Sequence, residues 1–110
     1  MIPGSVRIFV CREPQDMRRG FDRLALAAMQ TTGVDAQSGA MFVFANRGST
    51  RLKVLWWDGN GFCVLYKRLH RALFRLPQGE GSTATISGRE LAVLLRGVPR
   101  RASRRAQPRA

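Results

Sequence analysis

The chain has 110 residues, enough for one small domain, and its 45% hydrophobic and 24% charged residues are typical of a chain that folds. Its 17 arginines and 2 lysines against 7 acidic residues give a net charge of +12, which favours polyanionic partners. No apolar run approaches the roughly 20 residues needed to cross a bilayer, which excludes a membrane-spanning chain.

The N-terminus and the cysteines indicate a reducing compartment. Residues 1–7 lack the charged start and long apolar run of a signal peptide, so we expect a cytoplasmic protein. Cys11 and Cys63 lie inside apolar runs, which favours reduced, buried thiols over a disulfide or a reactive thiol. One histidine and two cysteines cannot assemble a four-ligand zinc site, and we expect no cofactor and no small-molecule substrate.

The last 12 residues differ from the rest of the chain. Residues 99–110 contain five arginines, two prolines and no large apolar side chain, so they cannot bury enough surface to offset the entropy of ordering. The sequence therefore predicts a compact domain over residues 1–98 and a disordered arginine-rich tail over residues 99–110. Residues 1–98 keep 14 basic and 7 acidic side chains, a net charge of +7, so the domain is itself basic.

The first predicted elements are a strand, a helix and a second strand. Residues 6–11 form a short strand that ends before Pro14. A helix follows near residues 17–31, with Asp16 as its N-cap and Gly33 at its end. Its apolar stripe recurs at helical spacing and consists of Phe21, Leu24, Ala25 and Ala28. Residues 41–45 are apolar on both faces, as in a central strand.

Residues 51–69 predict a β-hairpin. Two aromatic and β-branched runs flank the turn Asp58-Gly59-Asn60-Gly61. With a two-residue loop, paired residue numbers sum to an odd value, so odd positions of the first strand share a face with even positions of the second. One face then carries Leu52, Val54, Trp56, Cys63 and Leu65. The other is apolar near the turn and basic at the open end, and carries Arg51, Lys53, Leu55, Trp57, Phe62, Val64, Tyr66 and Arg68.

The C-terminal part of the domain ends in a second helix. Residues 70–76 fit a strand or a helical turn equally well before Pro77 interrupts them. Ser87 and Glu90 form a capping box for a helix near residues 87–97, which Gly97 and Pro99 terminate. Its core stripe is Leu91, Leu94, Leu95 and Val98.

The sequence contains few residues that could form a catalytic site. Metal-assisted chemistry needs convergent carboxylates, but Asp16, Asp58 and Glu90 are better explained as a helix cap, a turn residue and half of a capping box. No phosphate-binding loop of the Gly-x-x-x-x-Gly-Lys-Ser/Thr type occurs. His70 lies in a basic run without a nearby acid to orient it, so a phosphate contact or a plain surface position is the better interpretation. We expect a protein that is not an enzyme.

A basic surface remains as the candidate site. Arginine and lysine side chains of the hairpin, the following segment and the tail can contact DNA phosphates, with Tyr66 and Trp57 available for stacking. The alternative is a solvated face on which the aromatic residues are covered by a helix or a partner. The candidate DNA-binding residues are Arg51, Lys53, Tyr66, Lys67, Arg68, Arg71, Arg75, Arg100, Arg101, Arg104 and Arg105.

Four segments carry a resemblance to a known family. They are residues 16–22 (DMRRGFD), 42–47 (FVFANR), 51–62 (RLKVLWWDGNGF) and 65–69 (LYKRL). Over residues 6–98, the chain resembles the TnpB-type proteins encoded by the second open reading frame of IS66 insertion sequences. Where similar proteins read Lys/Arg-Gly-Arg-Phe-x-Trp-Pro, residues 71–77 lack the glycine and the tryptophan.

This resemblance implies a small accessory protein of a bacterial transposon, encoded beside a larger transposase that carries the acidic catalytic residues. It assigns no catalytic or binding residue to the chain. We expect a single α+β domain: a mostly antiparallel sheet of about five strands with two main helices. The expected function is non-catalytic support of transposition through binding of DNA, mainly its phosphate backbone, or of the partner transposase, or of both. The alternatives are a pure protein-interaction subunit without direct DNA binding and, as a minor one, a nuclease-like enzyme.

Overall fold

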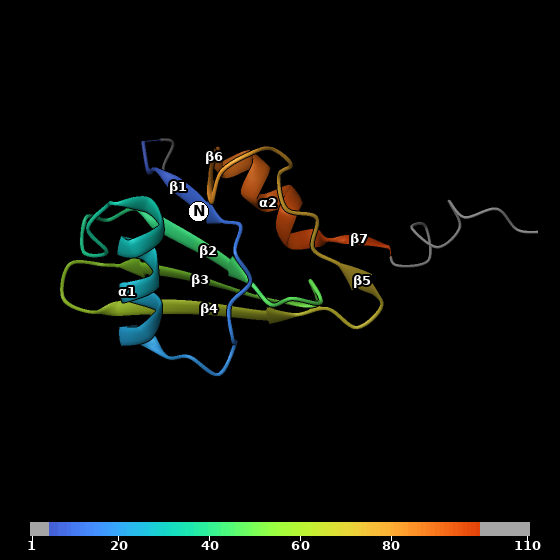
Figure 1. Ribbon diagram of the computed structural model, residues 1–110, viewed down its shortest axis with the longest axis horizontal. Helices are drawn as coiled ribbons and strands as arrows, with labels where there is room; N and C mark the ends of the chain where they lie inside the picture. Colours follow the sequence, from blue (N-terminus) through green and yellow to red (C-terminus); the bar gives the residue numbers. More distant parts are fainter. Residues whose placement is uncertain (1–4, 100–110) are drawn as a thin grey trace, which may run out of the picture.

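A five-stranded sheet with the order β4-β3-β2-β1-β6 forms the centre of the molecule (Figure 1). The computed structural model describes residues 5–99. The strands of the sheet are β1 (Ile8–Cys11), β2 (Met41–Ala45), β3 (Arg51–Trp57), β4 (Phe62–Arg68) and β6 (Thr83–Ile86). The helices are α1 (Phe21–Thr32) and α2 (Gly88–Arg96), and β5 (Ala72–Leu73) pairs with β7 (Val98–Pro99) in a separate small sheet. The predicted α+β domain is confirmed.

The sheet is antiparallel except at one position. β1 and β2 are parallel neighbours because the chain returns through α1 between them, and parallel strands require such a crossover. β1 also pairs with β6, near the end of the domain, so it lies between two strands from distant parts of the sequence. The remaining pairs, β2–β3 and β3–β4, are antiparallel.

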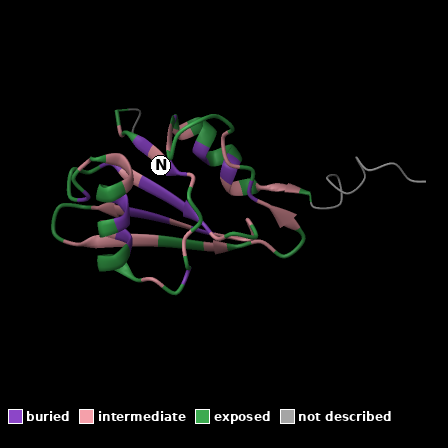
Figure 2. Ribbon diagram, viewed as in Figure 1, coloured by how far each residue is buried: buried purple, intermediate pink, exposed green. Residues whose placement is uncertain are grey.

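Each face of the sheet has its own hydrophobic core, because side chains of a strand alternate between the faces. Phe42 and Phe44 pack with Leu24 of α1 in one cluster. Val43 packs with Leu91 of α2 in the other. The central strand β2 is buried along most of its length, as predicted (Figure 2). The two helices therefore cover opposite faces of the sheet.

The predicted hairpin is confirmed, with its register. β3 and β4 pair over seven positions, from Arg51 opposite Arg68 to Trp57 opposite Phe62. The Asp58 carboxylate accepts hydrogen bonds from the backbone amides of Asn60 and Gly61, at 3.0 and 3.1 Å, which closes the turn. The division of side chains between the two faces follows the predicted parity.

The start of the first helix was predicted too early. α1 begins at Phe21, with Gly20 as N-cap, and Asp16 does not cap it. Instead, the Asp16 carboxylate accepts a bond from the Arg18 amide at 2.9 Å, in a turn that precedes the helix. Phe21 was predicted in the buried stripe but is 49% exposed, whereas Ala27 is buried. Phe21 is the first residue of the helix, and the buried side consists of Leu24, Ala27 and Ala28.

The second helix follows its prediction closely. Ser87 caps α2, and the reciprocal bonds between Ser87 and Glu90 are both present. Gly97 ends the helix with φ of +75°, and a Cβ atom at this position would lie 2.6 Å from Cδ1 of Leu69. Only glycine fits there. Of the ambiguous residues 70–76, the structure places Ala72–Leu73 in strand β5.

The last described residue, Pro99, belongs to β7. The predicted disordered tail otherwise lies outside the described residues, so the boundary after residue 98 stays a prediction. No helix within residues 5–99 has the length and apolarity needed to cross a bilayer.

Candidate nucleic-acid interface

Two arginines face each other at the open end of the hairpin. Arg51 of β3 lies directly opposite Arg68 of β4, on the sheet face that α1 covers nearer the turn. Neither side chain makes a hydrogen bond or an ion pair within residues 5–99, where the one ion pair joins Arg18 and Asp16. Cβ atoms of directly opposed residues are about 5 Å apart, so two like charges here destabilise the hairpin.

The neighbouring pair on the same face combines a cation with an aromatic ring. Lys53 lies opposite Tyr66, and its Nζ atom is 5.0 Å from the centre of the tyrosine ring. The ammonium group also donates to the backbone oxygen of Arg19 at 3.0 Å, which leaves further N–H donors free. Tyr66 is 53% exposed, so its ring is accessible to a ligand on this face.

The segment before α1 adds charge to this surface. The bond from Lys53 places the backbone of Arg19 beside the hairpin, 34 residues away in sequence. The Arg19 guanidinium donates to the Gln15 side chain at 2.9 Å. Arg18 forms an exposed ion pair with the Asp16 carboxylate at 2.9 Å, and this contact lowers the pKa of Asp16 from 3.8 to about 2. Arg19 therefore adds an uncompensated charge, whereas Arg18 adds little.

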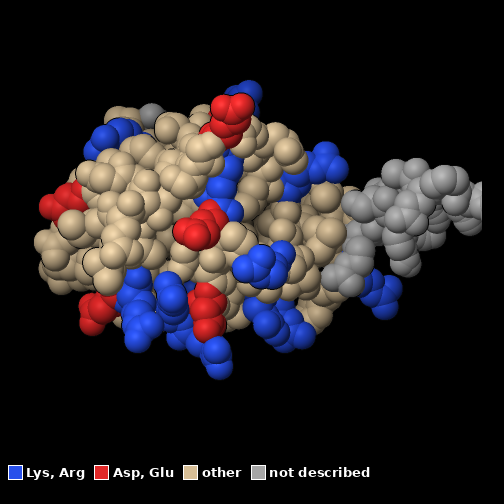
Figure 3. Space-filling model, viewed as in Figure 1, with Lys and Arg blue, Asp and Glu red and all other residues tan. Residues whose placement is uncertain are grey.

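We define the hairpin patch as Arg19, Arg51, Lys53, Tyr66 and Arg68. Figure 3 shows lysine and arginine atoms gathered along the lower edge of this side of the molecule, with some acidic atoms between them. The sequence predicted every member of the patch except Arg19. No local signal identifies Arg19, because its position depends on a contact between distant segments.

Lys67 lies on the other face of the sheet. It pairs with the buried Leu52, and its Nζ atom donates to the backbone oxygen of Leu95 at 2.7 Å. A cation is favourable there because the last carbonyl groups of a helix carry partial negative charge. Lys67 therefore ties β4 to the end of α2 and lies apart from the hairpin patch.

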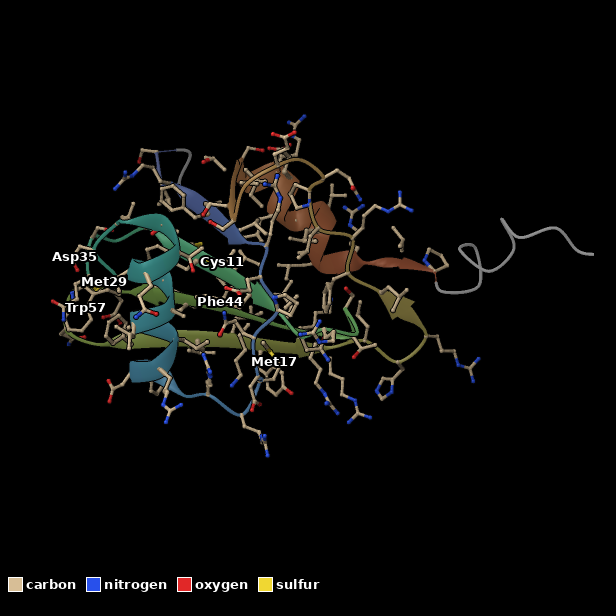
Figure 4. The ribbon with its side chains drawn as sticks, viewed as in Figure 1. Cys11, Met17, Met29, Asp35, Phe44 and Trp57 are labelled. Carbon is tan, nitrogen blue, oxygen red and sulfur yellow. The ribbon has the colours of Figure 1, made fainter. Side chains whose placement is uncertain are left out.

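The aromatic residues near the turn form a separate group. Trp57 and Phe62 contact each other edge to face, with ring centres 5.0 Å apart, and both are half-buried. Trp57 lies at the turn end of the strands (Figure 4). Six residues of strand separate it from Arg51, which is about 20 Å. Trp57 therefore lies away from the patch, whereas Tyr66 belongs to it.

The remaining candidates lie elsewhere. Arg71 and Arg75 are exposed and flank β5, and Arg75 borders a hollow beside α2. The tail candidates lie outside the described residues: Arg100, Arg101, Arg104 and Arg105.

Comparison with known proteins identifies the family. A family model described as IS66 Orf2-like protein matches residues 6–105. The chain belongs to the IS66 Orf2-like family. Members of this family are accessory proteins of IS66 transposition.

Two relatives come from Sinorhizobium fredii (strain NBRC 101917 / NGR234). The protein y4hO is 39% identical over 100 residues, which cover 89% of this chain and 87% of y4hO. The protein y4jC is 30% identical over 94 residues, which cover 86% of this chain and 80% of y4jC. Both are described as uncharacterized proteins. No solved structure matches the chain.

Three acidic residues of this IS66 Orf2-like protein stabilise local backbone structure. Asp16 and Asp58 accept backbone amides in turns, and Glu90 completes the capping box of α2. Within residues 5–99, no three histidine, cysteine or acidic side chains come together as metal ligands.

Both cysteines of this IS66 Orf2-like protein are free thiols. Cys11 is fully buried in the core beneath α1, and burial raises its pKa to about 12. Cys63 is only half-buried, contrary to prediction, and its Sγ atom lies 3.5 Å from the Asp58 carboxylate. Desolvation, and then the Asp58 carboxylate, raise the pKa of Cys63. Neither thiol has the lowered pKa of a nucleophile.

Proposed function

We propose that this accessory protein binds the phosphate backbone of duplex DNA through the hairpin patch. The observation that supports this most strongly is the pair Arg51–Arg68. Two arginines directly opposite each other on neighbouring strands, without a carboxylate partner among the described residues, cost stability in the free protein. A phosphate bound between them replaces this repulsion with two charge-assisted hydrogen bonds. A bound anion would therefore explain why Arg51 and Arg68 lie opposite each other without a carboxylate partner.

The neighbouring residues suit a nucleic acid rather than a small anion. Lys53 and Arg19 extend the charge along the same face, and Tyr66 presents an exposed ring to the sugar-phosphate backbone. Phosphate contacts fix position without reading sequence. The arginines of residues 100–110 add further charge to the chain. We propose that the protein binds DNA with little sequence preference and does not itself catalyse a reaction. It would act in the cytoplasm, together with the transposase of the same element.

A salt titration tests this proposal. Fluorescence anisotropy with labelled duplexes compares element ends with random sequence at several salt concentrations. If roughly 5 to 8 phosphates are contacted, log affinity should fall against log salt with a slope of about −4.5 to −7. Similar affinity for both duplexes would support backbone recognition. Absence of binding at low salt, or binding insensitive to salt, would contradict the proposal and favour the alternative of a protein-interaction subunit.

A further inference from the structure

An apolar groove of about 560 Å³ lies between α2 and the segment of residues 75–78. The chain after β5 runs alongside α2, on the face of the sheet opposite α1 (Figure 1). Ile86 and Leu94 are buried core residues that form part of the groove wall. Val93 also lines the groove but is 57% exposed. Among these apolar residues, Val93 is the one whose side chain is largely exposed to solvent.

Two cations border the apolar surface. Arg75 and Arg89 line the groove, and both are exposed. Neither makes a hydrogen bond or an ion pair among residues 5–99. The nearest acid in the lining, Glu90, is engaged, because its carboxylate accepts the Ser87 amide at 2.8 Å. The groove therefore combines apolar walls with two arginines and one carboxylate, which leaves a net charge of +1 among its lining residues.

This combination restricts what can fill the groove. DNA presents phosphates but would leave the exposed Val93 against a polar surface, and the hairpin patch lies on the other face of the sheet. Residues 100–110 have no large apolar side chain, and their arginines would meet Arg75 and Arg89. A second copy would bring a domain with a net charge of +7 toward these cations. An amphipathic segment with apolar and acidic side chains fits both features.

We propose that this groove binds such an acidic, apolar segment of a partner protein. Resting on the proposed role in transposition, the partner is the transposase of the same element. Apolar side chains of the segment cover Val93, and its carboxylates pair with Arg75 and Arg89. The two sheet faces then have separate tasks: the α1 face contacts DNA, and the α2 face contacts protein.

Binding assays with matched variants test the proposal. The full chain is titrated with the purified transposase and with overlapping synthetic peptides that together cover the transposase sequence. Val93→Glu should weaken binding at least about tenfold, because the new carboxylate makes the apolar wall polar, competes for Arg89 one turn away and repels an acidic segment. Leu26→Glu is the control, since Leu26 is similarly exposed, at 54%, but lies on α1. Both substituted positions are exposed, so melting temperatures should change little.

Charge reversal gives the second comparison. Arg89→Glu should weaken binding of the transposase and of its acidic, apolar peptides more than it weakens DNA binding. Arg51→Glu combined with Arg68→Glu should do the opposite. Amide signals of residues 75–78 and of α2 should shift when the peptide binds.

Three results would overturn the proposal. They are the absence of binding by both transposase and peptides, equal binding by the Val93→Glu and parent proteins, and selection of peptides without acidic and apolar residues. Failure of the DNA-binding proposal is a separate result. In that case the parent protein would show no salt-dependent binding of duplex DNA. It would still bind the peptide, and the Val93→Glu protein would not.

Discussion

Replacing Arg51 or Arg68 by glutamine should stabilise the fold and weaken DNA binding at the same time. Glutamine keeps much of the aliphatic stem and removes the charge. Relief of a like-charge pair directly opposite across two strands is worth about 0.2 to 1 kcal/mol. For a domain of this size, that corresponds to an increase in melting temperature of roughly 1 to 6 °C. Because either single substitution removes the repulsion, the double variant should gain little beyond the better single one.

The same substitutions should reduce the salt dependence of DNA binding. Each lost phosphate contact lowers the slope of log affinity against log salt by about 0.9, so the double variant should lose about 1.8. Thermal unfolding and fluorescence anisotropy on the same preparations measure both effects. Arg89→Gln removes one equivalent charge from the opposite side of the sheet, where Arg89 is exposed on α2. It should change the slope less than either hairpin variant.

Thermal unfolding and anisotropy together distinguish a DNA-binding role of Arg51 and Arg68 from a charge pair that only lowers stability. If Arg51→Gln and Arg68→Gln raise stability but bind DNA with the parent slope, the pair contacts no phosphate. If they lower stability, the two guanidinium groups do not repel each other in the free protein, and the physical basis of the proposal is wrong.

Four further outcomes follow from the structure. Phe42→Ala should destabilise the fold by about 3 to 5 kcal/mol in urea denaturation, because this ring is fully buried in the central strand. The Asp16 carboxylate, whose pKa is lowered from 3.8 to about 2, contributes stability that is present above pH 3.8 and is lost as the pH falls toward 2. Urea denaturation of the parent and of Asp16→Asn across this pH range should show the loss in the parent only. A thiol reagent at pH 8 should modify Cys63 in the folded protein and Cys11 only on unfolding, because Cys11 is buried and its pKa is raised to about 12. Deleting residues 100–110 should leave the melting temperature nearly unchanged but lower the salt slope of DNA binding, since this segment carries five arginines.

The hairpin and the second helix could be predicted because their signals are local. The turn at Asp58–Gly61 sets the parity of the pairing, and this parity distributed the side chains correctly between the two faces. The same parity places Lys67 beside Leu52, so its separation from the patch followed from the sequence, although it was included among the candidate residues. The capping box of Ser87 and Glu90 fixed the start of α2 in the same way.

Features that depend on distant contacts could not be predicted. The parallel pairing of β1 with β2 and the position of β6 beside β1 join segments far apart in sequence. Asp16 was a reasonable cap from its residue type, but its carboxylate is held by Arg18 in a preceding turn. Arg19 joins the patch only through the bond from Lys53. The groove beside α2 likewise requires residues 75–78 and 86–98 to come together.

The position of β1 between β2 and β6 affects how the protein folds during synthesis. β2 is complete at Ala45, whereas β6 ends at Ile86, about 40 residues later. At about 5 to 20 residues per second, the ribosome needs roughly 2 to 8 s to produce this interval. During that time, β1 lacks its second neighbour, and its outer backbone groups can pair with another nascent chain. The β3–β4 hairpin lies within this interval and depends only on local contacts, so it can form before the sheet is complete.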